Sequence, residues 1–151
     1  MNKPAILIVP GSFSAASSYH EIVNSLTANG YEAIVSNLPS ASRRAPQPPA
    51  TMADDAAHFH DMASKLADEG KEIILVAHSY GGVVASEAAK GLAKTEREVA
   101  GKPGGIARLV FLSSVVIPVG SSLKSVMGEL DVPFIKVDVS DFLIDLRSCR
   151  S

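Results

Sequence analysis

Four short runs of apolar and β-branched residues recur along this chain, separated by segments with a different pattern. They are "PAILIVPG" (4–11), "YEAIVSN" (31–37), "EGKEIILVAHS" (69–79) and "IARLVFLSSVV" (106–116). Continuous apolar character over so few residues is typical of strands buried on both faces, as in a parallel sheet. We therefore expect these strands to lie beneath covering helices.

The segments between the runs carry helical patterns. "SSYHEIVNSLTANG" (17–30) opens with Ser18 and Glu21 at capping-box spacing, and the segment from Thr51 repeats that spacing with Asp54. "YGGVVASEAAKGLA" (80–93) is rich in small residues, which favours a helix packed closely on a sheet. The alternation predicts an α/β fold, with a mainly parallel sheet and helices on both faces. The Pro-rich stretch 38–50 and the polar stretch 95–105 are predicted to be loops.

The last third is less regular. "SSLKSVMGEL" (121–130) has the apolar spacing of a short helix, and "FIKVDVS" (134–140) alternates like a half-exposed strand. "DFLIDLRSCRS" (141–151) has no clear pattern. We find no internal repeat, so a single domain over residues 1–151 is expected.

Composition excludes several functional classes. The net charge of −2 and the absence of a basic run give no reason to expect a nucleic-acid partner. No stretch approaches the roughly 20 apolar residues that would span a membrane. Cys149 is the only cysteine, which suits a reducing, cytoplasmic compartment. No group of residues has metal-ligand spacing, and no cofactor motif is present.

The stretch "VAHSYGG" (76–82) carries the clearest chemical signal. A strand that runs into a helix through a serine between small residues is typical of a nucleophile elbow, where the sharp turn admits only small neighbours. Here Ala77 and Gly81 flank Ser79, and the Tyr80 N–H would point to a developing oxyanion. The alternative is that Ser79 is the N-cap of an ordinary strand–helix loop.

"AHSYGG" together with "VPGSF" (9–13) resembles the α/β-hydrolase family, in the branch of small esterases and hydroxynitrile-lyase-like enzymes. The resemblance covers about residues 3–130, with Ala77 where the pattern most often has glycine. It implies that Ser79 is the nucleophile. It also implies that the backbone N–H groups of Ser12 and Tyr80 form the oxyanion hole, and that Gly11 and Phe13 line the pocket. It implies the strand order second, first, third, fourth, a small-molecule substrate and no cofactor.

In that family the acid and the histidine follow the serine in chain order. The four histidines here are His20, His58, His60 and His78, and none follows Ser79, although Asp131, Asp138, Asp141 and Asp145 do. On its strand, His78 is predicted to point away from Ser79. His58 and His60 are predicted to diverge on a solvated helix face with Asp54 and Asp61. His20 could approach the pocket mouth.

The expectation is therefore a truncated α/β-hydrolase fold that lacks its C-terminal part, and a chain nearly inactive as an esterase-like serine hydrolase. Two alternatives stay open: a non-catalytic remnant or binding domain, and a hydroxynitrile-lyase-like activity in the complete protein. The fourth strand would then leave an exposed apolar edge, which predicts self-association.

Overall fold

The computed structural model describes residues 3–127, 136–138 and 143–145. The chain divides into two compact units, Met1–Val116 and Ile117–Ser151. The first unit contains the candidate nucleophile, Ser79.

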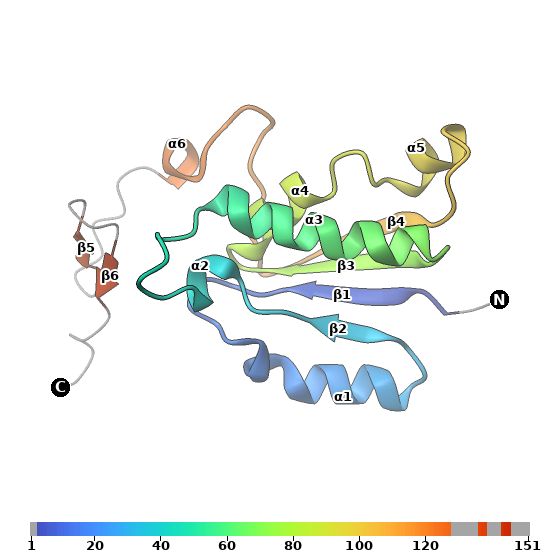
Figure 1. Ribbon diagram of the computed structural model, residues 1–151, viewed down its shortest axis with the longest axis horizontal. Helices are drawn as coiled ribbons and strands as arrows, with labels where there is room; N and C mark the ends of the chain where they lie inside the picture. Colours follow the sequence, from blue (N-terminus) through green and yellow to red (C-terminus); the bar gives the residue numbers. More distant parts are fainter. Residues whose placement is uncertain (1–2, 128–135, 139–142, 146–151) are drawn as a thin grey trace. The chain divides into compact units, whose positions relative to one another are not determined.

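The first unit is built on a four-stranded parallel sheet (Figure 1). Its strands are β1 (Ala5–Val9), β2 (Ala33–Val35), β3 (Glu72–His78) and β4 (Gly105–Leu112), in the order β2-β1-β3-β4. The predicted strands, their parallel direction and their order are all confirmed. Because the strands are parallel, the carboxyl ends of β1 and β3 meet at the same edge of the sheet, where Val9 is in register with Ala77.

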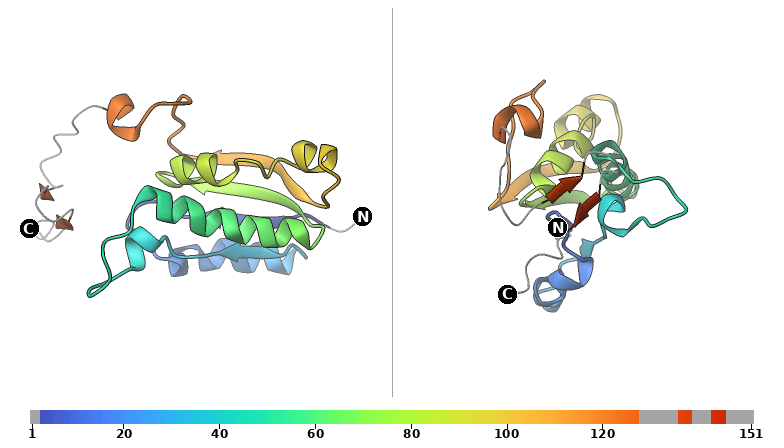
Figure 2. Two further views of the ribbon diagram at one scale, coloured as in Figure 1. Left: turned by 45° about the horizontal axis from the view of Figure 1, so that its top comes forward. Right: turned by 90° about the vertical axis from the view of Figure 1, so that its left-hand side faces the viewer.

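Helices cover both faces of this sheet. The 3₁₀ turn η1 (Ala16–Tyr19) leads into α1 (His20–Ala28), and the chain later forms α3 (Met52–Asp68) and α4 (Gly81–Ala88). The left-hand view of Figure 2 shows α3 in front of the sheet and α1 behind it. The main core lies under α3 and α4. Its members from the sheet and from these two helices include Leu7, Val9, Leu75, Ala77, Phe59, Ala63 and Val84.

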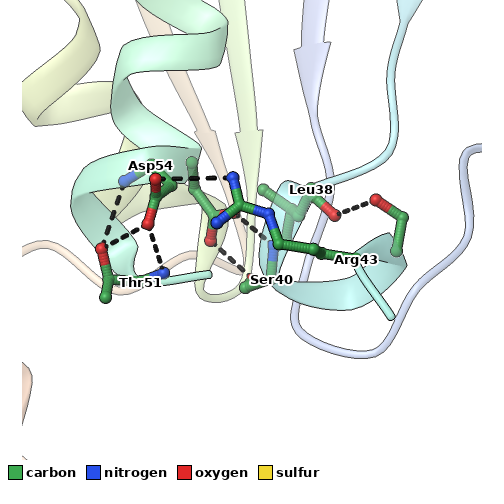
Figure 3. Close-up of polar contacts among 7 residues, drawn as sticks. Leu38, Ser40, Arg43, Thr51 and Asp54 are labelled. Carbon is green, nitrogen blue, oxygen red and sulfur yellow. Dashed lines mark hydrogen bonds and ion pairs between the residues drawn. The ribbon is translucent and has the colours of Figure 1, made fainter. Parts of the chain in front are cut away.

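The entry to α3 is a complete capping box, as predicted. The Thr51 side chain accepts a hydrogen bond from the Asp54 N–H, and the Asp54 carboxylate accepts one from the Thr51 N–H at 2.7 Å. Figure 3 shows this pair beside Arg43, whose guanidinium lies 3.5 Å from the Asp54 carboxylate. The box predicted at Ser18 and Glu21 is absent: α1 begins at His20 without a side-chain cap.

Both predicted loops contain short helices. In the Pro-rich stretch, α2 (Pro39–Ser42) starts with proline, whose fixed φ suits the first helical turn. In the polar stretch, α5 (Lys94–Val99) is held by Arg97, which is only 4% exposed. The Arg97 guanidinium donates to the carbonyls of Pro103 and Gly104 and to Asp68. The prediction of loops was therefore wrong at these two places.

Strand β4 forms one edge of the sheet within the described residues. From Ala107 onward its side chains are exposed, although most of them are apolar. The large exposed members are Leu109, Val110, Phe111 and Leu112. An exposed apolar edge was predicted for this segment and is found.

The second unit contains α6 (Leu123–Met127) and an antiparallel pair, β5 (Lys136–Asp138) with β6 (Leu143–Asp145). The predicted short helix and the predicted alternating strand are found in shorter form, whereas no pattern in the sequence indicated β6. Asp131, Asp141 and Cys149 lie outside the described residues. Among the described residues, no helix is both long and apolar enough to cross a membrane.

Candidate active site at the turn between β3 and α4

Ser79 stands between the last residue of β3 and the start of α4, at the carboxyl end of the sheet. Its φ of 53° lies in the left-handed region, which non-glycine residues avoid. Such a conformation costs about 1–3 kcal/mol and persists only where the surroundings impose it. The predicted strained backbone at Ser79 is confirmed.

The small residues around Ser79 are required by close backbone approaches. A Cβ on Gly81 would lie 2.5 Å from the Val9 carbonyl oxygen and 2.7 Å from that of Pro10. A Cβ on Gly82 would collide with the Val115 carbonyl oxygen. The elbow is therefore wedged between the end of β1 and the segment after β4, and no larger residue fits at either glycine.

The carbonyl oxygen of Ser79 is held by three donors. It accepts hydrogen bonds from the Gly82 N–H at 3.1 Å, the Val115 N–H at 3.0 Å and the Ser114 hydroxyl at 2.8 Å. Ser113, which precedes Ser114 and Val115 in the chain, has a φ of 44° and is a second strained residue. Sequence reasoning missed Ser113 and Ser114, because the "LSSVV" end of the fourth run reads only as more strand.

The loop after β1 lies against the elbow. A Cβ on Gly11 would be 3.1 Å from the Ser79 Cβ, so Gly11 and Ser79 are in close contact, as predicted. Phe13 has a φ of 60° and is 56% exposed. Among residues 3–127, neither the Ser12 N–H nor the Tyr80 N–H has a hydrogen-bond partner. These two backbone N–H groups, one in this loop and one at the start of α4, are free to donate hydrogen bonds to an anionic oxygen.

A pocket of about 380 Å³ lies beside the same loop. Its lining includes Phe13, Ser14, Asn37, Ser42 and Arg44. The wall is formed by the loop after β1 and by α2 with its flanking residues. Phe13 is part of this lining, whereas Gly11 is not, so the role of both residues in a substrate pocket stays a prediction.

His78 is tied to Tyr19. Its Nδ1 lies 2.7 Å from the Tyr19 hydroxyl oxygen, which also accepts the Gly11 N–H at 3.0 Å. The two rings pack edge to face. Within the described residues no hydrogen bond joins His78 to Ser79, and the contacts of His78 fit the packed histidine that the sequence predicts. Through Tyr19, His78 supports the loop at Gly11.

The other three histidines make no hydrogen bond to Ser79 among the described residues. His20 is exposed on α1. His58 Nε2 lies 2.8 Å from the Ser36 hydroxyl, and His60 Nδ1 lies 2.9 Å from the Ala88 carbonyl oxygen. The two side chains diverge, as predicted, but the prediction of a solvated face was wrong. Because α3 lies between the end of β2 and α4, both histidines are half-buried against neighbouring segments.

Asp55 is the charged residue that sequence reasoning overlooked. It is 0% exposed and accepts hydrogen bonds from the Ser40 N–H at 2.8 Å, the Ser40 hydroxyl at 2.6 Å and the Tyr80 hydroxyl at 3.1 Å. Burial, followed by the negative charge of Asp55 and this hydrogen bond, raises the pKa of Tyr80. One signal was available: Asp55 precedes Phe59 by four residues, so it falls on the buried face of the helix.

No group of three or more histidine, cysteine or acidic side chains could hold a metal ion among the residues that the structure covers. What the described site does offer is a serine in a strained turn, two unpaired backbone N–H groups and a neighbouring pocket. That arrangement suits attack on a carbonyl carbon, with the carbonyl oxygen received by the backbone.

Comparisons with known proteins agree with this architecture. A model of the alpha/beta hydrolase family matches residues 6–147. The alpha/beta hydrolase nvfD of Aspergillus novofumigatus is 37% identical over 131 residues, covering 87% of this chain and 50% of that protein. The probable hydrolase R7 of a Phoma species is 33% identical over 150 residues, covering 94% of this chain and 58% of that protein.

The fold likeness extends to a solved structure. The crystal structure of tomato methylketone synthase I, complexed with 2-tridecanone, has a TM-score of 0.65 at 22% identity. The alignment covers 87% of this chain and 50% of that chain. The present chain thus spans about half the length of the relatives it matches. The match of the family model over most of the sequence shows that the chain belongs to the alpha/beta hydrolase family.

Proposed function

We propose that this chain carries the nucleophile half of a serine hydrolase that acts on a small ester or a related carboxylic derivative. Ser79 is the nucleophile, and the backbone N–H groups of Ser12 and Tyr80 form the oxyanion hole. The single observation that carries the proposal is the φ of 53° at Ser79, at a turn that glycines on both neighbouring segments make possible. An ordinary N-cap serine needs no such strain.

In the proposed reaction the Ser79 Oγ bonds to the acyl carbon while a base takes the hydroxyl proton. Negative charge moves to the carbonyl oxygen, which accepts hydrogen bonds from the two backbone N–H groups. The bond to the leaving oxygen then breaks, and an acyl group remains on Ser79 until water removes it. In this proposal the substrate lies between Gly11, which contacts Ser79, and Phe13, which lines the neighbouring pocket.

We propose that the base is not a residue of this chain. No histidine follows Ser79, and the half-length coverage of both relatives supports a domain whose acid and histidine belong to a further part of the fold. We propose that residues 1–151 form one incomplete α/β-hydrolase domain, and a cytoplasmic location stays a prediction. General-base help is worth roughly 10²–10⁴-fold, so this chain alone should turn over very slowly.

A missing base can be supplied from solution, and this gives the test. The 151-residue chain and its Ser79→Ala variant are treated with p-nitrophenyl acetate over a series of imidazole concentrations. We expect imidazole to support the release of p-nitrophenolate and the accumulation of one acetyl group on Ser79, located by peptide mass spectrometry. Subtracting the Ser79→Ala rate removes hydrolysis by imidazole itself.

The alternatives give different results. If Ser79 gains no acetyl group at any imidazole concentration, the hydrolase proposal is wrong and a binding role without chemistry is favoured. The absence of a hydrogen bond from His78 to Ser79 in the described residues is the observation behind that second candidate. A hydroxynitrile-lyase-like activity in the complete protein would appear as cyanide release from a cyanohydrin without an acyl intermediate.

A further inference from the structure

The buried carboxylate of Asp55 has no part in the reaction as proposed, yet it is the best-connected side chain next to the elbow. Its Oδ1 accepts the Ser40 N–H, and its Oδ2 accepts the Ser40 and Tyr80 hydroxyls. An ionised carboxylate only accepts hydrogen bonds, so three donors on two oxygens match the ionised form. The three donors also supply the hydrogen bonds that make full burial of this charge tolerable.

The hydrogen bond to Tyr80 reaches the residue that follows the nucleophile. Tyr80 is half-buried and caps α4, with φ of −53° and ψ of −30°. Its backbone N–H is one of the two candidate oxyanion donors. Its side-chain hydroxyl is fixed by the hydrogen bond to Asp55. Fixing the phenol end of Tyr80 therefore restricts how the peptide N–H at the other end can tilt.

The other two hydrogen bonds join Asp55 to α2. Ser40 lies in α2, and Arg43 just after it pairs with Asp54 at the start of α3 (Figure 3). Asp55 thus connects α2, α3 and the elbow through one side chain. The chain around α2 also lines the pocket beside Phe13, so the same carboxylate supports the wall of the pocket and the oxyanion donor.

We propose that Asp55 is a positioning residue for catalysis, which holds the Tyr80 N–H in the direction of the oxyanion by gripping the Tyr80 hydroxyl. The inference rests on the proposed function, because it assigns a role within that oxyanion hole. Asp55 touches no substrate. Its effect is on the transition state, where the oxyanion forms, rather than on substrate binding.

The test compares Asp55→Asn and Tyr80→Phe with wild type in the imidazole-supported acetylation of Ser79. Asp54→Asn is the matched control: it removes the neighbouring carboxylate of the same helix, which caps α3 and contacts neither Ser40 nor Tyr80. We expect the saturating acetylation rate to fall about tenfold in both test variants, since hydrogen bonds to charged groups are among the stronger ones. In Tyr80→Phe, which keeps the hydrogen bonds of Asp55 to Ser40 and so the pocket wall, the half-saturating ester concentration should stay unchanged.

Two further readouts separate positioning from plain stability. The double variant Asp55→Asn/Tyr80→Phe should be acetylated no more slowly than the slower single variant. Both changes act on the same hydrogen bond, between the Tyr80 hydroxyl and Asp55, so their effects should not add. Asp54→Asn should lower the thermal midpoint while leaving the acetylation rate at the wild-type value. If Asp55→Asn does not fold, Tyr80→Phe decides alone, because it removes one hydroxyl from a half-buried ring.

The possible failures are distinguishable. If Ser79 is acetylated as fast in Tyr80→Phe as in the wild type, the positioning role is wrong and the hydrolase proposal stands. An equal slowing in Asp54→Asn at a temperature where it is folded would also overturn it. Absence of any Ser79 acetylation in the wild type would end both proposals together.

Discussion

Ser79 combines an unfavourable backbone conformation with a carbonyl oxygen that three donors hold in place. The strain could be anticipated from sequence, because Ala77 and Gly81 leave room for a turn that larger neighbours would block. The donors could not, because Ser114 and Val115 come from a distant segment and reach the elbow only after β4 has paired with β3. Asp55 was missed for a related reason: a carboxylate next to a helix cap suggests an exposed cap residue.

The strain at Ser79 predicts an unusual order of stabilities for two variants. The free energy of unfolding of Ser79→Gly should exceed that of Ser79→Ala by about 1 kcal/mol, because glycine adopts a positive φ without a steric penalty. Glycine elsewhere in a folded chain normally costs stability relative to alanine. Urea unfolding of both variants measures the difference, and a more stable Ser79→Ala would contradict the strained elbow.

Asp54 gives a prediction about pH. The Thr51 N–H, the Thr51 hydroxyl and Arg43 lower the pKa of Asp54 from its usual value near 4. A lowered folded-state pKa adds stability that is present above about pH 4 and is lost as the pH falls through the folded-state value. The stability gap between wild type and Asp54→Asn should therefore be largest near neutral pH and should close in acid. Thermal unfolding across that pH range checks it, and a constant gap would argue against the capping carboxylate.

At the scale of helices and strands, sequence patterns predicted the elements that local interactions stabilise. The four strands, α3 and the small-residue helix α4 follow from apolar runs, capping residues and spacing. The helices α2 and α5 were predicted as loops because proline and charge dominate their sequences. Each is held by contacts that sequence does not reveal: the buried Asp55 with Ser40 for α2, and the buried Arg97 for α5.

The burial of Arg97 can be tested by removing its charge while keeping most of its stem. Arg97→Met should lower the free energy of unfolding by about 2–3 kcal/mol, because the carbonyls of Pro103 and Gly104 lose a charged donor. Asp68→Asn is the control. The Asp68 side chain is 65% exposed, and an exposed partner contributes about 0–1 kcal/mol. Chemical denaturation measures both, and equal losses would show that the ion pair, rather than the two carbonyls, holds α5.

For the first unit as a whole, the distribution of apolar surface is uneven. The faces of β1 are covered, whereas β4 has no strand beyond it in the described residues and presents Leu109, Val110, Phe111 and Leu112 to solvent. Sequence predicted this edge from strand order and from apolar character. What covers it cannot be read from a local pattern, because covering an edge is a matter of which other segment or chain comes to lie there.

We propose that β4 pairs with the β4 of a second copy when the 151-residue chain is alone. Unpaired apolar edges associate, and a lysine on the edge prevents pairing. Val110→Lys should shift the chain from oligomer to monomer in light scattering. Val99→Lys, at a lone valine that is 92% exposed on α5, should leave the oligomer unchanged. A wild-type chain that is monomeric at high concentration would refute the proposal.

The Ser114 hydroxyl and the Val115 N–H, which hold the Ser79 carbonyl oxygen, are synthesised after the turn itself. A nascent chain that has left the ribosome only as far as Gly104 already contains the whole "AHSYGG" sequence. It has not yet made two of the three donors that hold the strained turn. We expect Ser79 to remain in a relaxed turn, without the positive φ, until β4 emerges and pairs with β3. Synthesis would thus delay the strained turn at Ser79 until the sheet that contains it is in place.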